Sequence, residues 1–302
     1  MSVAWDISWN QIVNFDDYGA LLPLVQNSLI AGALLGVVGG LVSFFVISRD
    51  LPFAVHGISE LSFAGASGAL LLGASVVVGS FVGSLLAALA LGLLGLRARD
   101  RNSIIGVLMP FGLGLGILFL ALYQGRAANK FGLLTGQIVA IDNTSLGVLV
   151  VTAIAVLAVL AVIWRPLLFA SVDPEVAAAR GVPVRALGVL FVVLLGCAVA
   201  ISIQVIGALL ILTLLCTPAA AALQVTSSPR LAPLLSVVFA TVSMVGGILL
   251  ALGAAVPISP YVTTLSFLIY LVCRVIGTVR RRGGRRAEAP AVTAMPAPTA
   301  AS

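Results

Sequence analysis

The chain has 302 residues, of which 61% are hydrophobic and only 9% are charged. Because a soluble globular domain carries about 25% charged residues, this composition excludes a water-soluble domain and indicates a chain embedded in lipid. The net charge is +6, but nucleic-acid binding requires a basic face on a soluble module, so we expect no nucleic-acid partner.

Intervals with few or no charges predict nine membrane-spanning helices. A spanning helix needs about 20 mainly apolar residues. Intervals that fit one helix each are residues 19–48, 102–125 and 143–164. Intervals that fit two helices with a tight connection are residues 51–96, 186–229 and 231–273. We therefore predict an all-α, polytopic integral membrane protein.

The basic residues predict how these helices are oriented. Lys and Arg are retained on the cytoplasmic side of a membrane. With nine spans and the N-terminus outside, all but two of the 16 lysines and arginines fall inside, the exceptions being Arg126 and Lys130. Adding or removing one span would destroy this bias. We predict a multi-pass protein of the plasma (inner) membrane with its C-terminus in the cytoplasm.

The chain is predicted to form one membrane domain with two water-exposed ends. Residues 1–20, which are acidic, form an extracytoplasmic segment, and residues 21–277 form the transmembrane domain. Residues 278–302 form a cytoplasmic tail that begins with the basic run RRRGGRR and continues as a disordered Ala/Pro/Thr stretch. The basic run is a membrane anchor or a contact for anionic lipid.

Small residues and prolines predict how the spans pack and where they are interrupted. Glycines at four-residue spacing allow close helix contact in lipid, and they recur in spans one and three, at Gly32, Gly36, Gly40, Gly79 and Gly83. Pro110 and Pro218 each remove a backbone hydrogen bond and should kink spans four and seven. Residues 131–141 are apolar but too short to span, so we expect a re-entrant or interfacial piece on the outer side.

Residues 173–187 predict a short helix on the cytoplasmic face between spans five and six. Asp173 is a good N-cap, Pro174 suits the first helical position, and Glu175 complements the positive helix end. Gly181, with a proline two residues later, ends the helix. A soluble motor subunit could grip a surface helix of this kind.

His56 and Glu60 are the strongest candidates for chemistry inside the membrane. His56 is the only histidine of the chain, and Glu60 is the only acidic residue within a predicted span. Residues i and i+4 share a helix face about 6 Å apart along the axis, so both side chains can reach one cation. An unpaired acid inside a bilayer costs at least ~2.5–3.5 kcal/mol, and imidazole with carboxylate suits zinc, manganese or ferrous iron.

Other interpretations of this pair stay open. Both side chains could extend to the cytoplasmic interface, or His56 could bond Glu60 without a metal. Two ligands do not complete a metal site, and three polar residues on other spans could add to it or simply join helices: Asn27, Gln204 and Thr217.

Several segments together resemble the permease subunits of zinc, manganese and iron ABC importers, the ABC-3 type. The segment 173–184 (DPEVAAARGVPV) resembles the cytoplasmic coupling segment of that family, and residues 205–210 and 214–220 resemble its following pair of spans. Its first two spans are matched by Gly36, Gly40, Arg49, Ser59, Gly65, Leu72 and Gly73. The resemblance runs in order from about residue 27 to residue 277.

The resemblance implies a function and a set of partners. In the family, a carboxylate and a histidine four residues apart near the start of span two are implicated in passing the metal. His56 and Glu60 occupy that place in swapped order. The implied cargo is a divalent ion, zinc or manganese, moved by alternating access. The coupling residues would be Asp173, Pro174, Glu175, Arg180 and Gly181.

The implied partners are a cytoplasmic ATPase subunit that binds the ATP, an extracytoplasmic metal-binding protein, the membrane lipid, and a second permease, either an identical copy in a homodimer or a different paired permease. We expect no cofactor in this chain. A nucleotide-binding loop requires Gly-Lys-Ser/Thr, whereas the only lysine lies between Asn129 and Phe131. A single histidine also excludes an HExxH site. The chain is therefore predicted not to be an enzyme.

Three alternatives remain at this point. A secondary transporter would usually show internal repeats and several charges at the membrane midplane, and neither is evident. An ABC permease for an iron chelate or a corrinoid would need a wide pathway without direct metal ligands. A membrane scaffold or receptor without transport would leave the coupling segment and the His/Glu pair unexplained.

Overall fold

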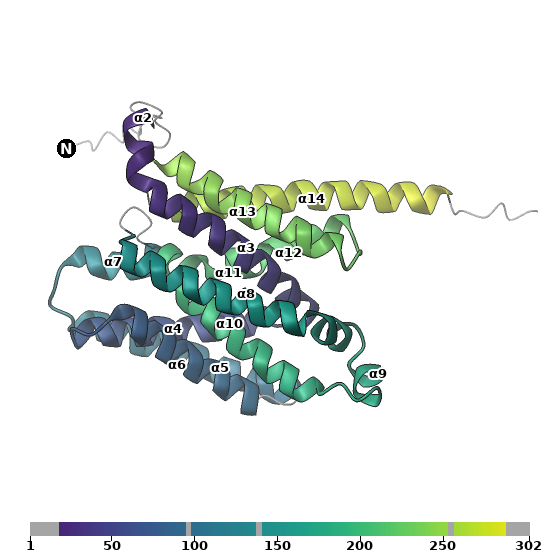
Figure 1. The fold of residues 1–302 in the computed structure, drawn as a ribbon, viewed down its shortest axis with the longest axis horizontal. Helices are drawn as coiled ribbons and strands as arrows, with labels where there is room; N and C mark the ends of the chain where they lie inside the picture. Colours follow the sequence, from purple (N-terminus) through teal and green to yellow (C-terminus); the bar gives the residue numbers. More distant parts are fainter. Residues whose placement is uncertain (1–17, 95–97, 137–140, 253–256, 288–302) are drawn as a thin grey trace, which may run out of the picture.

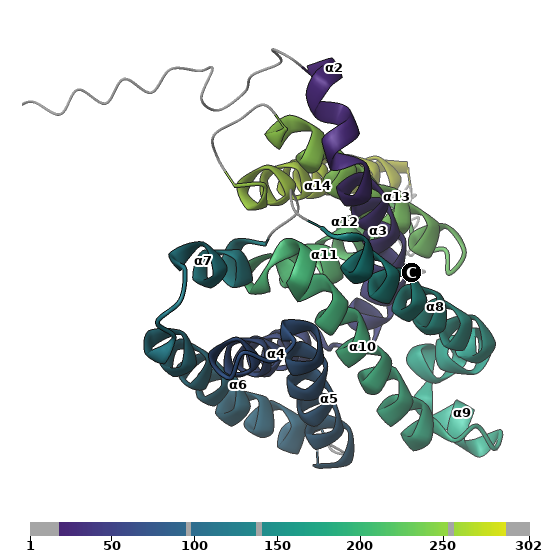
Figure 2. The same ribbon diagram turned by 60° about the vertical axis from the view of Figure 1, so that its left-hand side comes forward.

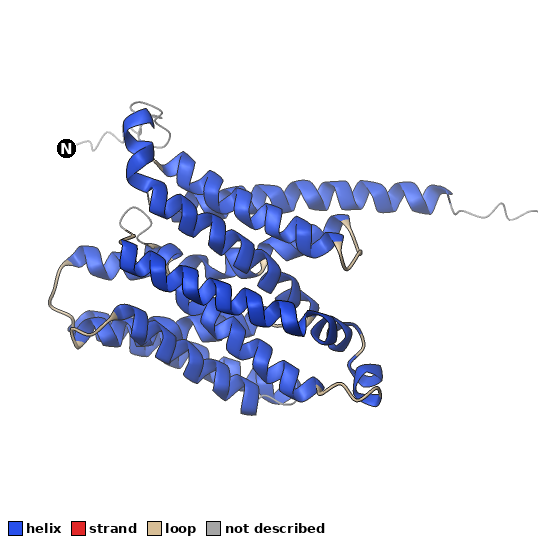
Figure 3. Cartoon of the chain, viewed as in Figure 1, coloured by secondary structure: helices blue, strands red, loops and turns tan. Residues whose placement is uncertain are grey.

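The computed structural model describes residues 18–94, 98–136, 141–252 and 257–287. Every regular element in these ranges is a helix (Figure 3). The long helices are α3 (Gln26–Ser48), α4 (Pro52–Leu71), α5 (Val76–Leu94), α6 (Ala98–Leu122), α8 (Asn143–Val172), α10 (Val184–Ile206), α13 (Leu231–Ala251) and α14 (Ser259–Ala287). The short ones are α2 (Tyr18–Leu21), η1 (Leu22–Val25), α7 (Ala127–Thr135), α9 (Pro174–Ala179), η3 (Ala208–Leu210), α11 (Ile211–Leu215) and α12 (Thr217–Val225).

Seven segments of the described residues are long and apolar enough to cross a membrane. They are Leu22–Ser48, Val76–Leu94, Asn102–Leu122, Asn143–Val172, Val184–Ile206, Leu231–Ala251 and Ser259–Arg280. Each overlaps an interval in which the sequence predicts a span. The prediction of an all-α, polytopic membrane protein is therefore confirmed.

The two other predicted spans correspond to less regular helices. Helix α4 has 20 residues, but His56, Glu60 and several serines make it more polar than the seven. The segment after α10 is divided, because Cys216 has φ −128° and ψ −48° and separates α11 from α12. Pro218 lies in the first turn of α12, where a proline is tolerated. Pro110, in contrast, lies inside α6, which continues from Ala98 to Leu122.

The helices form a bundle with two distinct ends (Figure 1). Helix α9, the connection between α12 and α13 and the C-terminal part of α14 lie at one end, on the right of the view; α2 and α7 lie at the other. Helix α4 packs against both α5 and α6, and α3 packs against α13 and α8. Helix α10 contacts α3, α4, α5 and α8, so it connects the two groups of helices, which Figure 2 shows from the side.

The predicted ends of the chain are only partly within the described residues. Residues 1–17 and 288–302 lie outside them. Helix α14 continues beyond Gly277 to Ala287, so the basic run of the predicted tail belongs to this helix. The predicted interfacial piece at residues 131–141 corresponds in part to α7, and its residues 137–140 lie outside the described ranges.

The glycines of α3 allow the backbone of α13 to approach closely, as their spacing predicts. A Cβ atom added to Gly36 would lie 2.6 Å from the Cα atom of Thr241, and one added to Gly40 would lie 2.5 Å from the Cα atom of Val237. The Ser236 hydroxyl donates a hydrogen bond of 2.8 Å to the Gly40 carbonyl. Close packing and hydrogen bonds between helices replace the hydrophobic driving force that is absent in lipid.

We predict that Gly40→Ala destabilises the protein by about 1–3 kcal/mol, because the added methyl group meets backbone that cannot move aside. The matched control is Gly147→Ala on α8, where an added Cβ meets nothing within 4 Å. Thermal unfolding of the purified protein in detergent should give a lower Tm for the first variant and little change for the second. Equal Tm values would contradict the close contact of α3 with α13.

Candidate functional site

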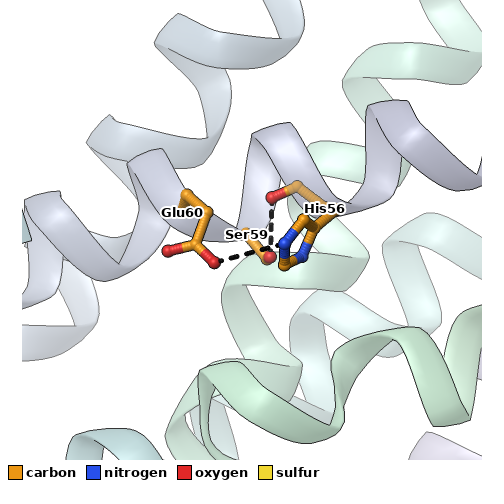
Figure 4. Close-up of polar contacts among 3 residues, drawn as sticks. All are labelled: His56, Ser59 and Glu60. Atoms are coloured by element: carbon orange, nitrogen blue, oxygen red, sulfur yellow. Dashed lines mark hydrogen bonds and ion pairs between the residues drawn. The ribbon is translucent and has the colours of Figure 1, made fainter. Parts of the chain in front are cut away.

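His56 and Glu60 lie in the first half of α4 and form a pair on one side of this helix. The His56 Nε2 atom is 3.6 Å from the Glu60 Oε1 atom, and the two side chains are 32% and 11% exposed. Both leave the same side of α4 (Figure 4). The Ser59 hydroxyl, between them in sequence, donates a hydrogen bond of 2.8 Å to the His56 carbonyl. The structure therefore brings the two predicted ligands together.

Helices α5 and α6 approach the backbone of α4 closely next to this pair. A Cβ atom added to Gly83 of α5 would overlap the Leu61 carbonyl, and one added to Gly112 of α6 would lie 2.9 Å from the carbonyl carbon of Glu60. The Ser62 hydroxyl also donates a hydrogen bond of 2.9 Å to the Ser80 carbonyl of α5. Helices α5 and α6 thus lie against the backbone of α4 at Leu61 and Glu60, while the side chains of His56 and Glu60 leave α4 together on one side.

The pair brings together two side chains of a kind that binds metal ions, and this is fewer than a complete ligand shell. Within the described residues, no group of three or more His, Cys, Asp or Glu side chains is placed to hold a metal ion. Asn27 lies in the first turn of α3 and donates hydrogen bonds to the Ile141 carbonyl and to Asn143 Oδ1, at 3.1 and 2.9 Å. Gln204 donates to Ser80 Oγ at 3.3 Å. These two predicted additions therefore join helices.

Thr217, the third predicted addition, lies in the first turn of α12, directly after the break at Cys216. Its side chain is half-buried. Broken helices inside a membrane leave backbone carbonyls without helical partners, so this region differs from the regular helices around it. The structure gives no contact that joins Thr217 to His56 or Glu60.

Helix α9 has the start and stop signals that the sequence predicts. The Asp173 carboxylate accepts a hydrogen bond of 3.0 Å from the backbone N–H of Val176, and Pro174 is the first residue of the helix. At the other end, Gly181 has φ +81°, and the N–H of Val182 donates to the Ala177 carbonyl at 3.0 Å. This pattern is a Schellman motif.

The same short helix is fixed on one face and open on the other. Ala177 is fully buried, whereas Glu175 and Arg180 are exposed. Only Asp173 separates α9 from the end of α8. Helix α9 therefore stands at the surface of one end of the bundle with both charged side chains accessible.

Residues 22–277 match the pattern of the ABC 3 transport family. The chain belongs to this family. It is thus an ABC-3 permease, a membrane transport subunit without an ATPase domain, as the sequence predicts.

Three known proteins illustrate the relationship. The manganese transport system membrane protein MntC of Halalkalibacterium halodurans is 29% identical over 225 residues, which cover 74% of this chain and 77% of MntC. The high-affinity zinc uptake system membrane protein ZnuB of Haemophilus influenzae is 24% identical, over 83% of this chain and 97% of ZnuB.

Among solved structures, PsaBC from Streptococcus pneumoniae in complex with Fab has a chain that superposes with a TM-score of 0.78. Its sequence identity is 25%, and the superposition covers 89% of the ABC-3 permease and 99% of that chain. The helical arrangement described above is therefore shared with a chain of this solved structure.

Sequence reasoning missed a cavity at the end of the permease opposite α9. It has a volume of about 310 Å³ and lies among α4, α5, α7, α8 and α10, with Asp142, Ser145 and Gln204 as polar lining residues. A hydrogen bond with the Ser145 side chain lowers the pKa of the Asp142 carboxyl, which favours its charged form. Asp is a favoured N-cap residue, so its position before an apolar run could have identified Asp142 as the start of α8.

We predict that Asp173→Ala frees the start of α9 at a cost of about 0.5–2 kcal/mol, because the N–H of Val176 loses its acceptor. Backbone amides of α9 should then exchange with deuterium faster, as measured by mass spectrometry. Asp173→Asn keeps an acceptor oxygen and should protect α9 nearly as well as the original residue. Equal exchange in all three proteins would show that the cap does not hold this helix.

Proposed function

We propose that this ABC-3 permease moves a bare divalent cation, manganese or zinc, through the membrane, and that His56 and Glu60 hold the ion in transit. The observation that carries the proposal is the His56–Glu60 pair, a histidine and a carboxylate that share one side of a helix within the bundle. Relatives named for manganese transport and for zinc uptake support both candidate ions. Both ions accept these ligands, and availability often decides between them.

The distance within the pair suits a shared cation. Zinc bonds to His nitrogen and to carboxylate oxygen are about 2.0–2.2 Å long, so two such ligands on one ion lie roughly 3.0–3.5 Å apart. The separation of 3.6 Å between Nε2 and Oε1 needs only a small adjustment. Two protein ligands leave the remaining positions for water or for passing groups. A transient binding site with two protein ligands is weak enough to release the ion, whereas a closed site with four protein ligands would retain it.

The proposed topology has nine spans, with the N-terminus outside and the C-terminus in the cytoplasm. Helix α4 and the divided segment α11–α12 complete the nine. This count places Arg49, Arg180 and Arg230 at the cytoplasmic end and leaves Arg126 and Lys130 outside, in accord with the retention of basic residues in the cytoplasm. Helix α9, which lies at the same end of the bundle as the α12–α13 connection, would then face the cytoplasm.

The energy would come from a separate ATPase subunit that docks on residues 173–187. Membership of an ABC family implies such a subunit and a protein that delivers the metal. Asp173, Pro174 and Gly181 would set the shape of the docking helix, and Glu175 and Arg180 would contact the ATPase. A metal-binding protein would deliver the ion at the opposite end of the bundle. Two permease copies would enclose the pathway, each with an ATPase subunit on its cytoplasmic side. ATP binding and hydrolysis then alternate access to the two sides.

We predict that His56→Ala and Glu60→Ala each reduce uptake of radioactive manganese or zinc by the complete transporter on the order of tenfold or more, because each removes a direct ligand. Ser59→Ala is the matched control, since it removes only a hydrogen bond to the backbone on the same face. Its uptake should stay near that of the original protein. Normal uptake by the His56→Ala, Glu60→Ala double variant would refute the transit site.

We predict that the double variant Glu175→Ala, Arg180→Ala weakens co-purification of the ATPase subunit several-fold, because two rim charges of the docking helix are lost. The control is Arg126→Ala, which changes an exposed charge at the opposite end. Both permease variants should be present in the membrane at the original level. ATPase recovery as high as with the unchanged permease would place the docking surface elsewhere.

A further inference from the structure

The side chain of Arg49 joins three helix ends at the end of the bundle that carries α9. Its Nη1 atom donates a hydrogen bond of 3.2 Å to the Ser171 hydroxyl of α8. Its Nη2 atom lies beside Gly188 of α10, 3.4 Å from the position that a Cβ atom would take there. Arg49 itself follows the last residue of α3. A planar guanidinium with several donors can contact two neighbours at once in this way.

Ser171 and Gly188, both beside the Arg49 guanidinium, lie on the two helices that flank α9. Ser171 belongs to the last turn of α8, which is separated from α9 by Asp173 alone. Gly188 belongs to the first turns of α10, which begins at Val184, soon after α9 ends. The Ser171 hydroxyl is also bound to its own helix, since it donates to the Leu167 carbonyl at 2.6 Å. A displacement of α9 therefore reaches both groups that contact the guanidinium.

The turn that contains Arg49 connects α3 firmly to α4. The N–H of Leu51 donates to the Val46 carbonyl at 2.9 Å, and the N–H of Asp50 donates to the Ile47 carbonyl at 3.3 Å. With Asp50 at φ +53°, this is again a Schellman motif, and Leu51 is buried. Helix α4 starts immediately afterwards at Pro52, and His56 follows within about two turns of Arg49.

An aromatic layer holds the same three helices together next to Arg49. The Phe45 ring of α3 meets the Trp164 ring of α8 edge-on at 4.9 Å and the Phe191 ring of α10 at 5.8 Å. Phe45 and Phe191 are fully buried. Rings in these arrangements add stability beyond their buried area. The end of α3 therefore contacts α8 and α10 in two places, through the rings around Phe45 and through the guanidinium of Arg49.

We propose that Arg49 is a positioning residue that transmits the displacement of α9 to α4, and so couples the ATPase to the His56–Glu60 pair. The proposal rests on the proposed function of α9 as the docking helix. Packed helices move as units with small sliding shifts. In this scheme a movement of α9 displaces the adjoining ends of α8 and α10, and these ends displace the guanidinium of Arg49. Because the turn after α3 is stiff, the first turns of α4 then move with Arg49. Arg49 itself touches neither the ATPase nor the metal in this scheme.

The test uses the complete transporter in lipid vesicles and measures metal ions moved per ATP hydrolysed. Arg49→Ala should keep ATPase binding and a substantial rate of ATP hydrolysis. The ratio of metal to ATP should fall on the order of tenfold, as expected for the loss of a hydrogen bond to a charged group. Arg49→Lys should retain part of the ratio, since an ammonium keeps the charge but cannot span both neighbours. Arg165→Ala, which removes an exposed arginine from α8, should leave the ratio unchanged.

Ser171→Ala tests the same contact without removing a charge. It should lower the ratio several-fold, and the double variant Arg49→Ala, Ser171→Ala should be no worse than Arg49→Ala alone. An unchanged ratio in Ser171→Ala and Arg49→Ala would overturn the proposal. If Arg49→Ala does not fold, the result for Ser171→Ala decides alone.

The outcome is distinguishable from a failure of the proposed function. Co-purification of the ATPase with Glu175→Ala, Arg180→Ala tests the docking helix without reference to Arg49. If Arg49→Ala itself loses the ATPase, Arg49 belongs to the docking surface or the folded core, and its assignment as a transmitting residue is wrong. If docking depends on α9 and the ratio does not depend on Arg49, only the transmission proposal is refuted.

Discussion

The close approach of the α5 and α6 backbones to α4 is the constraint on which the candidate site depends. Gly83 and Gly112 bring the α5 and α6 backbones against Leu61 and the carbonyl carbon of Glu60, which holds α4 closely in the bundle. In water, a carboxylate could turn toward solvent at little cost. Inside a bilayer it cannot, because a charged side chain that faces lipid costs several kcal/mol. The i,i+4 spacing then brings the histidine and the carboxylate together on one side of a helix that is held by its neighbours.

The two ends of the bundle carry different features. One end carries a short, well-capped helix with exposed charges, and the other carries a cavity lined by Asp142 and Gln204. The His56–Glu60 pair lies between them, closer to the end with α9, because α4 begins there. Schellman motifs end α3 and α9, and the chain continues from them into α4 and α10 respectively. Broken helices, such as α11–α12, occur where protein rather than lipid surrounds the backbone.

Much of this arrangement follows from local patterns in the sequence. Charge-free intervals predict helices in lipid because each backbone group must be satisfied within its own helix, and the caps of α9 could be predicted because Asp173 and Gly181 act on their own neighbours. The i,i+4 pairing of His56 and Glu60 is equally local. The interruption of span seven is expected from Pro218, and the structure places the break two residues earlier, at Cys216. The contact of Arg49 with Ser171 was not predictable in this way, because these residues are distant in sequence and meet only after the helices have packed.

The most direct test of the central claim uses the fact that His56 is the only histidine of the chain. A permease labelled with ¹⁵N-histidine, assembled with unlabelled partners, places the isotope at this single position. Electron–nuclear double resonance of bound Mn²⁺ should then show a ¹⁵N coupling that replaces the ¹⁴N coupling of the unlabelled complex and that disappears in His56→Gln. Manganese bound to the transporter with no change in nitrogen coupling on labelling would contradict the account, because the ion would then bind without His56 as a ligand.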